Sequence, residues 1–468
     1  MRIAVIASEV APFSKTGGLG DVVGALPPHL AKGAEVIVIA PRHRGSTGLA
    51  SSVTAEVPIR DTMQTVAFET ALIGTVPVYL VAHPLFDRDG IYGDASGDYR
   101  DNCERFVLFC RAALELLHAL KFAPDIVHVH DWQTALIPIY LKTIDASRFP
   151  RTKSVLTIHN LTYQGVFWHW DLPMTGLDWS LFNHRQLEFH GKMNLLKGGL
   201  VFADAITTVS PTYAREIQTP GQGCDLDGVL ADRTSAITGI LNGIDTSTWN
   251  PATDRLLAAR YSAEGMANKS KCKTAAKKKL GLKASKSPLF CFIGRLIEQK
   301  GIDLILGALD AIRSRGAQLA ILGTGDGRYR ETLEKAASDQ VAVRFGFDEV
   351  LAHELQGGSD FLLMPSLYEP CGLSQMYALR YGTIPVVRRT GGLADTVRHG
   401  ETGIVFGDYT VEALAAAVGE AMALYKSAKQ LKAMRAAGMS EELGWGPSAK
   451  KYLDLFRRLM GETPAGAP

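Results

Sequence analysis

Short apolar runs alternate with longer amphipathic stretches along most of the chain, and this alternation restricts the possible folds more than any other feature. The runs are rich in β-branched residues, while apolar residues in the stretches between them recur at helical spacing. Strands that alternate with helices form βαβ units and a mostly parallel sheet. In the first half, strands are expected at residues 2–8, 35–40, 76–83, 125–131, 153–160 and 205–210, and helices at 24–32, 102–120 and 136–144.

The alternation stops in a turn-rich segment at residues 240–251 and restarts near Pro288. Two similar units of this kind predict an α/β protein with two Rossmann-like, doubly wound domains that face each other across a deep cleft, a preferred place for ligands. We place the domains at residues 1–245 and 246–445, and expect residues 446–468 to carry a helix that packs back on the first domain. In the second half, strands are expected at 289–293, 318–322, 341–345, 361–365 and 384–387, and helices at 302–315, 329–337, 372–381 and 411–425.

Composition narrows the class of protein. A formal net charge of +2 gives no argument for a nucleic-acid partner. No apolar run approaches the roughly 20 residues that a membrane span needs, and no signal-peptide pattern opens the sequence, so we expect a cytoplasmic protein without a membrane partner. The six cysteines show no C-x-x-C spacing, which argues against a disulfide framework and a zinc site.

A lysine-rich segment at residues 269–286 lies between the two halves. Such a run is a basic patch for an anionic polymer or a solvated helix face. Because no aromatic residues interleave with the lysines, we favour the solvated helix face.

The segment from Lys15 to Asp21, KTGGLGD, lies between the first expected strand and the first expected helix. Glycines at such a place let the backbone approach a ligand, and a helix start offers unpaired N–H groups to an anion. Lys15 adds a mobile positive charge that suits a phosphate. The spacing matches neither the dinucleotide nor the Walker motif, and an ordinary glycine turn with a solvated lysine is the alternative.

The second half carries cations and a carboxylate in comparable places. Arg295 and Lys300 follow a predicted strand, where they suit a pyrophosphate that gains charge as it leaves. The alternative is an arginine and a lysine on an ordinary surface loop. Glu369 follows another strand, where its carboxylate suits sugar hydroxyls; the alternative is that it caps a helix. Gly372 and the turn at Thr390 and Gly391 come just before expected helices, whose N–H groups suit a phosphate.

Polar residues also end three strands of the first half, at residues 128–131, at residues 159–160 and at Ser210. His159 and Asn160 suit a sugar, although a lone histidine is more often structural. Asp131 has two interpretations: it acts as an acid or base in a reaction, or it only shapes the turn at the end of the strand. His128 and His130 share a face but lack a third ligand at a suitable spacing, so no metal is indicated. Four nearby aromatic residues suit sugar stacking or a core: Tyr163, Phe167, Trp168 and Trp170.

Taken together, these motifs resemble the bacterial glycogen synthases and their plant relatives, the starch synthases. The resemblance runs in order from end to end of the chain. It rests on KTGGL at residues 15–19, HDW at 130–132, HN at 159–160, SPTYA at 210–214, LNGID at 241–245, GRL at 294–296, EQKG at 298–301 and EPCGL at 369–373.

The resemblance implies a retaining glycosyltransferase of the GT-B architecture, which moves glucose from ADP-glucose to the non-reducing end of an α-1,4-glucan such as glycogen. It implies no metal or other cofactor, because cations and helix ends neutralise the leaving ADP. The donor adenine would stack against the second domain. By this resemblance Lys15, Gly18 and Asp21 would contact the donor, and Arg295 and Lys300 would bind the diphosphate. Glu369 would orient the glucosyl ring, with Cys371 and Gly372 at its edge. His159 would contact the transferred sugar, Asn242 would lie close to it, and Asp131 would line the cleft. Five further residues are expected to bind substrate: Gly17, Asn160, Leu373, Thr390 and Gly391.

The sequence departs from the pattern in three places. Gly20 stands where the family more often has alanine, and Leu367 with Tyr368 stand where Arg-Phe is usual, which removes one expected cation. Tyr377 stands where the wider retaining class often has a second glutamate, an absence that glycogen and starch synthases share.

Three other functions stay open. A related retaining enzyme would use UDP-glucose or a small acceptor, a non-catalytic regulator would bind a nucleotide sugar without turnover, and a nucleic-acid binder would use the lysine-rich segment.

Overall fold

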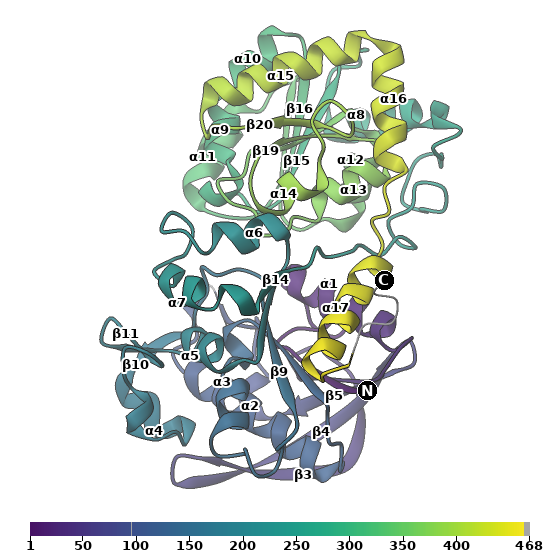
Figure 1. Ribbon diagram of the computed structural model, residues 1–468. Helices are drawn as coiled ribbons and strands as arrows, with labels where there is room; N and C mark the ends of the chain where they lie inside the picture. The colour runs from purple at the N-terminus through teal and green to yellow at the C-terminus, as the bar shows by residue number, and fades with distance from the viewer. Residues whose placement is uncertain (95, 463–468) are drawn as a thin grey trace. The chain divides into compact units, whose positions relative to one another are not determined.

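The computed structural model describes residues 1–94 and 96–462, and it divides into two compact units (Figure 1). Unit 1 comprises Met1–Gly243 and the C-terminal segment that begins at Trp445, and unit 2 comprises Ile244–Gly444. Each unit is built on a largely parallel sheet with helices packed on it, which confirms the predicted α/β class. Among the described helices, none is both long and apolar enough to cross a membrane.

Unit 1 contains a sheet of nine strands within the described residues, in the order β14-β13-β9-β8-β1-β2-β5-β4-β3. The strands from β14 to β5 are parallel, and β3 and β4 form an antiparallel hairpin that continues the sheet from β5. Sequence reasoning missed this hairpin, because its half-exposed strands lack the continuous apolar runs of buried parallel strands. The strands are β1 (Arg2–Ile6), β2 (Glu35–Pro41), β3 (Leu49–Ile59), β4 (Thr62–Ile73), β5 (Val76–Ala82), β8 (Ile126–His130), β9 (Lys153–Ile158), β13 (Ala205–Thr208) and β14 (Ile237–Gly239).

Two helices from opposite ends of the chain share one hydrophobic core of unit 1. Helix α1 (Gly18–Leu30) and helix α17 (Trp445–Leu459) pack together against the odd-numbered side chains of β1 and the even-numbered ones of β2. Tyr452 and Phe456 of α17 are fully buried there. Elsewhere in the unit, α2 (Asn102–Ala119) packs against β2 and β5, and α3 (Leu136–Lys142) packs against β9 and α5 (Leu195–Phe202).

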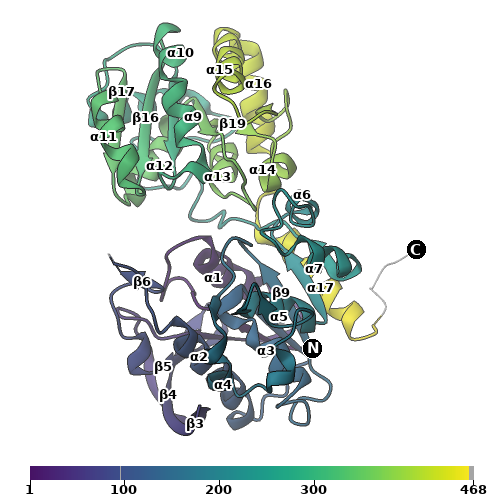
Figure 2. The same cartoon turned by 90° about the vertical axis from the view of Figure 1, so that its left-hand side faces the viewer.

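Unit 2 is a doubly wound sheet of six parallel strands within the described part of the chain, in the order β17-β16-β15-β18-β19-β20. Helices α9, α10 and α15 bury one face, and α8, α12 and α13 bury the other. Figure 2 labels α9, α10, α12, α13 and α15 around this sheet. The strands are β15 (Leu289–Ile293), β16 (Gln318–Gly323), β17 (Val341–Phe345), β18 (Phe361–Met364), β19 (Ile384–Arg388) and β20 (Ile404–Phe406). The helices are α8 (Lys269–Leu280), α9 (Ile302–Gly307), α10 (Leu309–Ser314), α11 (Gly327–Ala336), α12 (Glu349–Gly358), α13 (Ser374–Arg380), α14 (Gly391–Thr396), α15 (Val411–Lys426) and α16 (Ala428–Met439).

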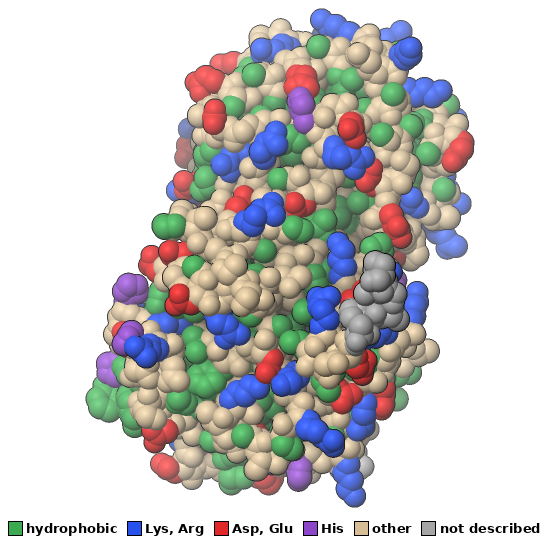
Figure 3. Space-filling view, viewed as in Figure 1, with side chains coloured by type: hydrophobic (Ala, Val, Ile, Leu, Met, Phe, Trp, Pro, Cys, Tyr) green, Lys and Arg blue, Asp and Glu red, His purple; other side chains and the backbone are tan. Residues whose placement is uncertain are grey.

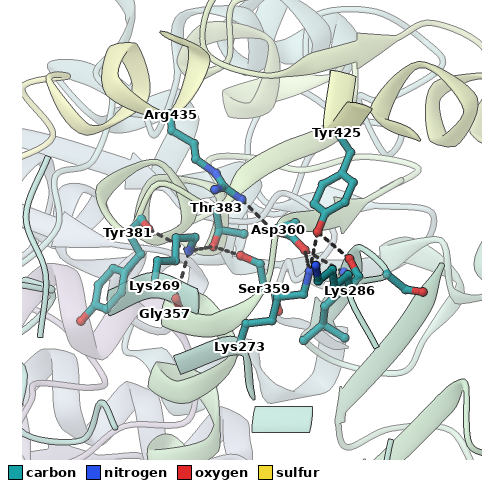
Figure 4. Close-up of polar contacts among 12 residues, drawn as sticks. Lys269, Lys273, Lys286, Gly357, Ser359, Asp360, Tyr381, Thr383, Tyr425 and Arg435 are labelled. Atoms are coloured by element: carbon teal, nitrogen blue, oxygen red, sulfur yellow. Dashed lines mark hydrogen bonds and ion pairs between the residues drawn. The ribbon is translucent and has the colours of Figure 1, made fainter. Parts of the chain in front are cut away.

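The lysine-rich segment forms α8, and the prediction that its lysines are solvated is wrong for one side of the helix (Figure 4). Lys269 is buried, and its ammonium donates to the carbonyl oxygens of Gly357 (3.0 Å) and Tyr381 (3.0 Å). Lys273 lies 2.6 Å from a carboxylate oxygen of Asp360. These lysines anchor α8 on unit 2, whereas five others are exposed as predicted: Lys271, Lys278, Lys279, Lys283 and Lys286.

Candidate active site

The glycine motif of unit 1 is the first turn of a helix. Helix α1 begins at Gly18, whereas the sequence predicted a start at Gly24. A side chain added at Gly17 would meet nothing within 4 Å, so the space before the helix start is open on the protein side. Lys15 and Asp21, both predicted to contact the donor, lie beside each other, with the ammonium 2.7 Å from the carboxylate.

Glu9 fixes this loop, and sequence reasoning did not identify it. Its buried carboxylate accepts hydrogen bonds from the backbone N–H of Thr16 (2.6 Å), the Thr16 hydroxyl (2.8 Å) and the backbone N–H of Gly17 (3.3 Å). The Tyr92 hydroxyl donates to the same carboxylate at 2.6 Å. A carboxylate that ties four donors together holds the glycine turn in one conformation. The signal in the sequence was only a glutamate just past a strand end.

Asp131 and His159 meet at the carboxyl ends of two adjacent parallel strands, β8 and β9. The Asp131 carboxylate accepts a hydrogen bond from the backbone N–H of His159 at 2.7 Å. Nδ1 of His130 and Nε2 of His159 share one hydrogen bond of 2.9 Å. Asp131 has φ +55 and ψ −171, a backbone region that residues other than glycine rarely adopt and that is found mainly at functional sites. The predicted strand-end residues therefore form one connected group.

Burial is the main cause of the pKa shifts of Asp131 and of the nearby histidines, and so sets which of them are charged. It raises the pKa of Asp131 to about 7, against the opposing effect of the N–H donors of His159 and Asn160. Burial also lowers the pKa of His128 and of His159 to about 3, and that of His130 well below its ordinary value. The imidazoles are therefore neutral near pH 7, so His159 offers a sugar hydrogen bonds rather than a positive charge.

Asn242 is a predicted sugar contact that the fold leaves partly unsatisfied. The residue follows β14, next to β13 and β9 in the sheet, and only 8% of it is exposed. Its amide oxygen has no hydrogen-bond partner among the described residues. A buried acceptor without a partner is costly, which makes it a candidate for a ligand hydroxyl. Asn160, by contrast, accepts from the N–H of Thr162 at 3.1 Å and so shapes its own turn.

Unit 2 brings Lys300 and Glu369 together from loops that follow β15 and β18. The Lys300 ammonium lies 2.5 Å from a carboxylate oxygen of Glu369, and the Ser366 hydroxyl donates to the same oxygen at 3.2 Å. Glu369 is buried and Lys300 half-buried. Arg295 is exposed and donates to the side chain of Gln299 at 3.0 Å. All these residues belong to the carboxyl edge of one parallel sheet, where α/β proteins bind ligands.

Backbone contacts around Glu369 require glycine. Gly391 has φ +44, and a Cβ there would lie 1.8 Å from the carbonyl oxygen of Glu369. The N–H of Gly392 donates to that carbonyl at 3.0 Å. The turn at Thr390 and Gly391 therefore lies against the Glu369 loop.

The rest of the EPCGL motif leads into α13. Cys371 is buried, Gly372 has φ +72, and Leu373 is the N-cap residue of α13, which begins at Ser374. The sequence predicted a helix start at Gly372, two residues earlier. The side chain of Cys371 therefore packs inside this loop and does not lie on its surface.

Two further residues at the same sheet edge were not identified from the sequence. Phe347, which follows β17, is 82% exposed. Arg388, at the end of β19, donates to the carbonyl oxygen of Leu367 at 2.6 Å, so a cation lies beside the position where the sequence lacks the usual arginine. A lone aromatic or arginine past a strand end gives too weak a sequence signal to be singled out.

Among the described residues, no group of three or more histidine, cysteine, aspartate or glutamate side chains is arranged to hold a metal ion. Across the same residues the six cysteines are free thiols, of which only Cys224 is exposed.

Comparison with known proteins matches both units. A family model described as the starch synthase catalytic domain matches residues 2–232, and one described as glycosyl transferases group 1 matches residues 273–436. A protein named glycogen synthase from Anaeromyxobacter sp. (strain Fw109-5) is 48% identical, over 98% of this chain and 99% of that protein. A protein named glycogen synthase 2 from Geobacter sulfurreducens is 45% identical, over 98% of each.

A solved structure is similar over nearly the whole chain. The catalytic domain of starch synthase IV from Arabidopsis thaliana, bound to ADP and acarbose, superposes with a TM-score of 0.91 at 34% identity. The similarity covers 98% of this chain and 99% of that one.

Proposed function

This chain belongs to the family of glycogen and starch synthases and is a glycosyltransferase, and from that premise we propose its donor, its acceptor and the residues that act on them. The proposed reaction is transfer of a glucosyl unit from ADP-glucose to the non-reducing end of an α-1,4-glucan, with retention at the anomeric carbon. The main support for this proposal is the 48% identity, over 98% of the chain, to the protein named glycogen synthase from Anaeromyxobacter sp. (strain Fw109-5).

The proposal assigns the nucleotide to unit 2. Arg295 and Lys300 meet the diphosphate, where fixed positive charge stabilises the charge that develops as ADP leaves. Phe347 is the proposed platform for the adenine, because it is an aromatic residue left 82% exposed at the same sheet edge. ADP in the similar starch synthase structure supports a nucleotide site of this kind.

Glu369 of unit 2 is assigned to the glucosyl ring of the donor, and strand-end residues of unit 1 are assigned to sugar hydroxyls. Once a diphosphate attracts Lys300, the Glu369 carboxylate becomes an acceptor for sugar hydroxyls. His159 is neutral and the amide oxygen of Asn242 lacks a partner among the described residues, so both suit hydroxyl groups. Lys15 and Asp21 contribute a cation and an acceptor at the start of α1.

The proposed mechanism retains configuration without a covalent intermediate. The acceptor hydroxyl attacks the anomeric carbon on the face from which ADP departs, and a phosphate oxygen of the leaving ADP takes the hydroxyl proton. The bond to the phosphate oxygen breaks as the new glycosidic bond forms. No metal has a part in this proposal, because the two cations of unit 2 meet the charge; activity in excess EDTA tests that point and is expected to be unchanged.

One assay tests the function. ADP release is measured from ADP-glucose with and without glycogen, beside UDP-glucose at equal concentration. The proposal expects release that depends on glycogen and is faster with ADP-glucose. Equal or faster turnover of UDP-glucose would overturn the donor, and tight ADP-glucose binding without any release would instead indicate a non-catalytic regulator. We propose the cytoplasm as the place of action, because the donor is a nucleotide sugar.

A further inference from the structure

Two residues at the carboxyl edge of the unit 2 sheet contact the loops of Lys300 and Glu369 without belonging to either loop. Arg388 is the last residue of β19, and Tyr409 lies between β20 and α15. Both side chains are half-buried. Figure 3 shows Lys and Arg side chains, in blue, over the region where Figure 1 labels β19 and β20, so this part of unit 2 carries positive charge on its surface.

Tyr409 holds the turn that carries Lys300. Its hydroxyl group shares its proton between the carbonyl oxygen of Glu298 (3.0 Å) and Oδ1 of Asp303 (2.8 Å). These acceptors lie on either side of Lys300, because Glu298 begins the turn Glu298–Lys300 and Asp303 lies in the first turn of α9. Burial and the Asp303 carboxylate raise the pKa of Tyr409, so the hydroxyl stays a donor at neutral pH.

Arg388 holds the loop that carries Glu369. Its Nη1 donates to the backbone carbonyl oxygens of Ser366 (3.3 Å) and Leu367 (2.6 Å). Its Nε donates, at 3.1 Å, to a carbonyl oxygen two residues before Tyr409, and its guanidinium carbon lies 5.6 Å from the centroid of the Tyr409 ring. The Arg388–Tyr409 pair therefore connects the Glu369 loop to the Lys300 turn through side chains from two further segments.

The two loops also contact each other directly through their backbones. The N–H of Leu367 donates to the carbonyl oxygen of Gln299 at 2.9 Å, and a Cβ at Gly301 would lie 2.2 Å from the carbonyl oxygen of Pro365. The Arg388–Tyr409 pair adds connections at other points of both loops, and connections at different points restrict the rotation of one loop against the other. The separation of Lys300 and Glu369 is therefore fixed by more than their own ion pair.

We infer that Arg388 and Tyr409 are positioning residues for the transfer reaction, because they hold the loops of Lys300 and Glu369 in one relative arrangement. This inference rests on the proposed function, which assigns the diphosphate to Lys300 and the glucosyl ring to Glu369. Small displacements of a group that meets developing charge reduce the rate strongly, since such stabilisation depends on groups fixed in advance. The charge on the diphosphate is greatest in the transition state, so a loss of positioning lowers kcat more than it raises KM.

The test uses Tyr409→Phe, which removes the hydroxyl and keeps the ring beside Arg388. ADP release from ADP-glucose is measured on the full chain in the presence of glycogen. We expect kcat to fall about tenfold, while KM for ADP-glucose changes by less than about threefold. A kcat within about twofold of the wild-type value would overturn the inference.

Tyr425→Phe is the matched control. Tyr425 is another half-buried tyrosine of unit 2, and its hydroxyl donates at 2.8 Å to the carbonyl oxygen of Lys286 (Figure 4). Lys286 precedes β15, so this contact lies at the opposite end of that strand from the Lys300 turn. Loss of this hydroxyl should leave kcat unchanged, and an equal fall in both variants would overturn the inference.

A positioning role also predicts that the effect depends on Lys300. In the Lys300→Met background no ammonium remains to be positioned, so adding Tyr409→Phe should lower kcat there by less than about twofold. If Tyr409 only supported the fold, the substitution would lower kcat equally in both backgrounds, and that result would overturn the inference.

Arg388→Lys separates positioning from a direct effect of charge. The ammonium keeps the positive charge, but it lacks the planar set of donors that reaches several carbonyl oxygens at once. We expect kcat to fall at least about fivefold. A wild-type kcat would mean that the charge alone matters, and would overturn the role assigned to Arg388.

A measurement of stability distinguishes failure of this inference from failure of the proposed function. If the wild type releases no ADP from ADP-glucose, the proposed function fails, and unfolding in urea then tests whether Tyr409 supports the Lys300–Glu369 pair. The combined variant Tyr409→Phe/Lys300→Met should raise the unfolding equilibrium constant by at least about fivefold less than the product of the two single effects. Effects that simply multiply would overturn the inference.

Discussion

Breaking the ion pair between Lys300 and Glu369 should cost both stability and catalysis, and the two losses have different causes. The two charged atoms are 2.5 Å apart, and the side chains are 19% and 6% exposed. Lys300→Met leaves the glutamate buried without its partner, for which we expect a loss of about 3 kcal/mol in the free energy of unfolding. Because the proposed function places Lys300 at the charge on leaving ADP, kcat should also fall by about 10²-fold or more.

A double-mutant cycle separates these effects. Glu369→Gln alone should destabilise less, by about 1 kcal/mol, because the half-buried lysine reaches water more easily than the buried carboxylate. The double variant Lys300→Met/Glu369→Gln should lose about 2 kcal/mol, less than the sum of the single losses, since no unpaired charge remains. Urea unfolding followed by circular dichroism measures the three values. Additive losses, or a kcat for Lys300→Met near the wild-type value, would refute the reasoning.

Three further changes test other parts of the structure. Asp131→Asn removes a carboxyl group whose pKa burial raises to about 7, so an unfolded chain ionises it from about pH 4 upward while the native chain keeps it protonated. The free energy of unfolding of the variant, relative to that of the wild type, should therefore rise by about 4 kcal/mol between pH 4 and pH 8, as urea unfolding at both pH values would show. A difference that does not change with pH would contradict the raised pKa of Asp131. Gly391→Ala places a Cβ 1.8 Å from a carbonyl oxygen and should lower kcat at least about tenfold in the ADP-release assay, whereas Gly407→Ala, with nothing within 4 Å, should not. Lys269→Met leaves buried carbonyl groups without a donor and should reduce the free energy of unfolding by about 3 kcal/mol, which a lower thermal midpoint would show. The exposed Lys271→Met should reduce it by less than about 0.5 kcal/mol.

The parallel strands were predictable because both faces of each are buried. Runs such as residues 289–293 are apolar without interruption, and the structure places β15 there with the predicted bounds. The hairpin of β3 and β4 was missed, since its long strands are partly exposed and its pairing with β5 is a tertiary effect. The start of α1 was predicted six residues late, because glycines at a helix start read as a loop.

Candidate residues could be predicted individually, but their partners could not. Lys300 and Glu369 lie in separate motifs 69 positions apart, and only the order of strands in the sheet brings the two loops together. For the same reason, Lys269 and Lys273 read as solvated, although their acceptors come from distant segments of unit 2. Local sequence shows which chemistry a side chain has, while burial decides whether its charge needs a partner.

If the donor binds as we propose, the pairing of Lys300 with Glu369 also constrains how the donor is recognised. A diphosphate that attracts the lysine weakens the hydrogen bonding of a buried carboxylate, which is costly unless another donor replaces the ammonium. Hydroxyl groups of the donor glucose are such donors, whereas ADP alone carries none at that position. The sugar therefore offsets a cost that the nucleotide creates. Under the proposed function, the charge assigned to the leaving group and the carboxylate assigned to the sugar become available together, when both parts of the donor are bound.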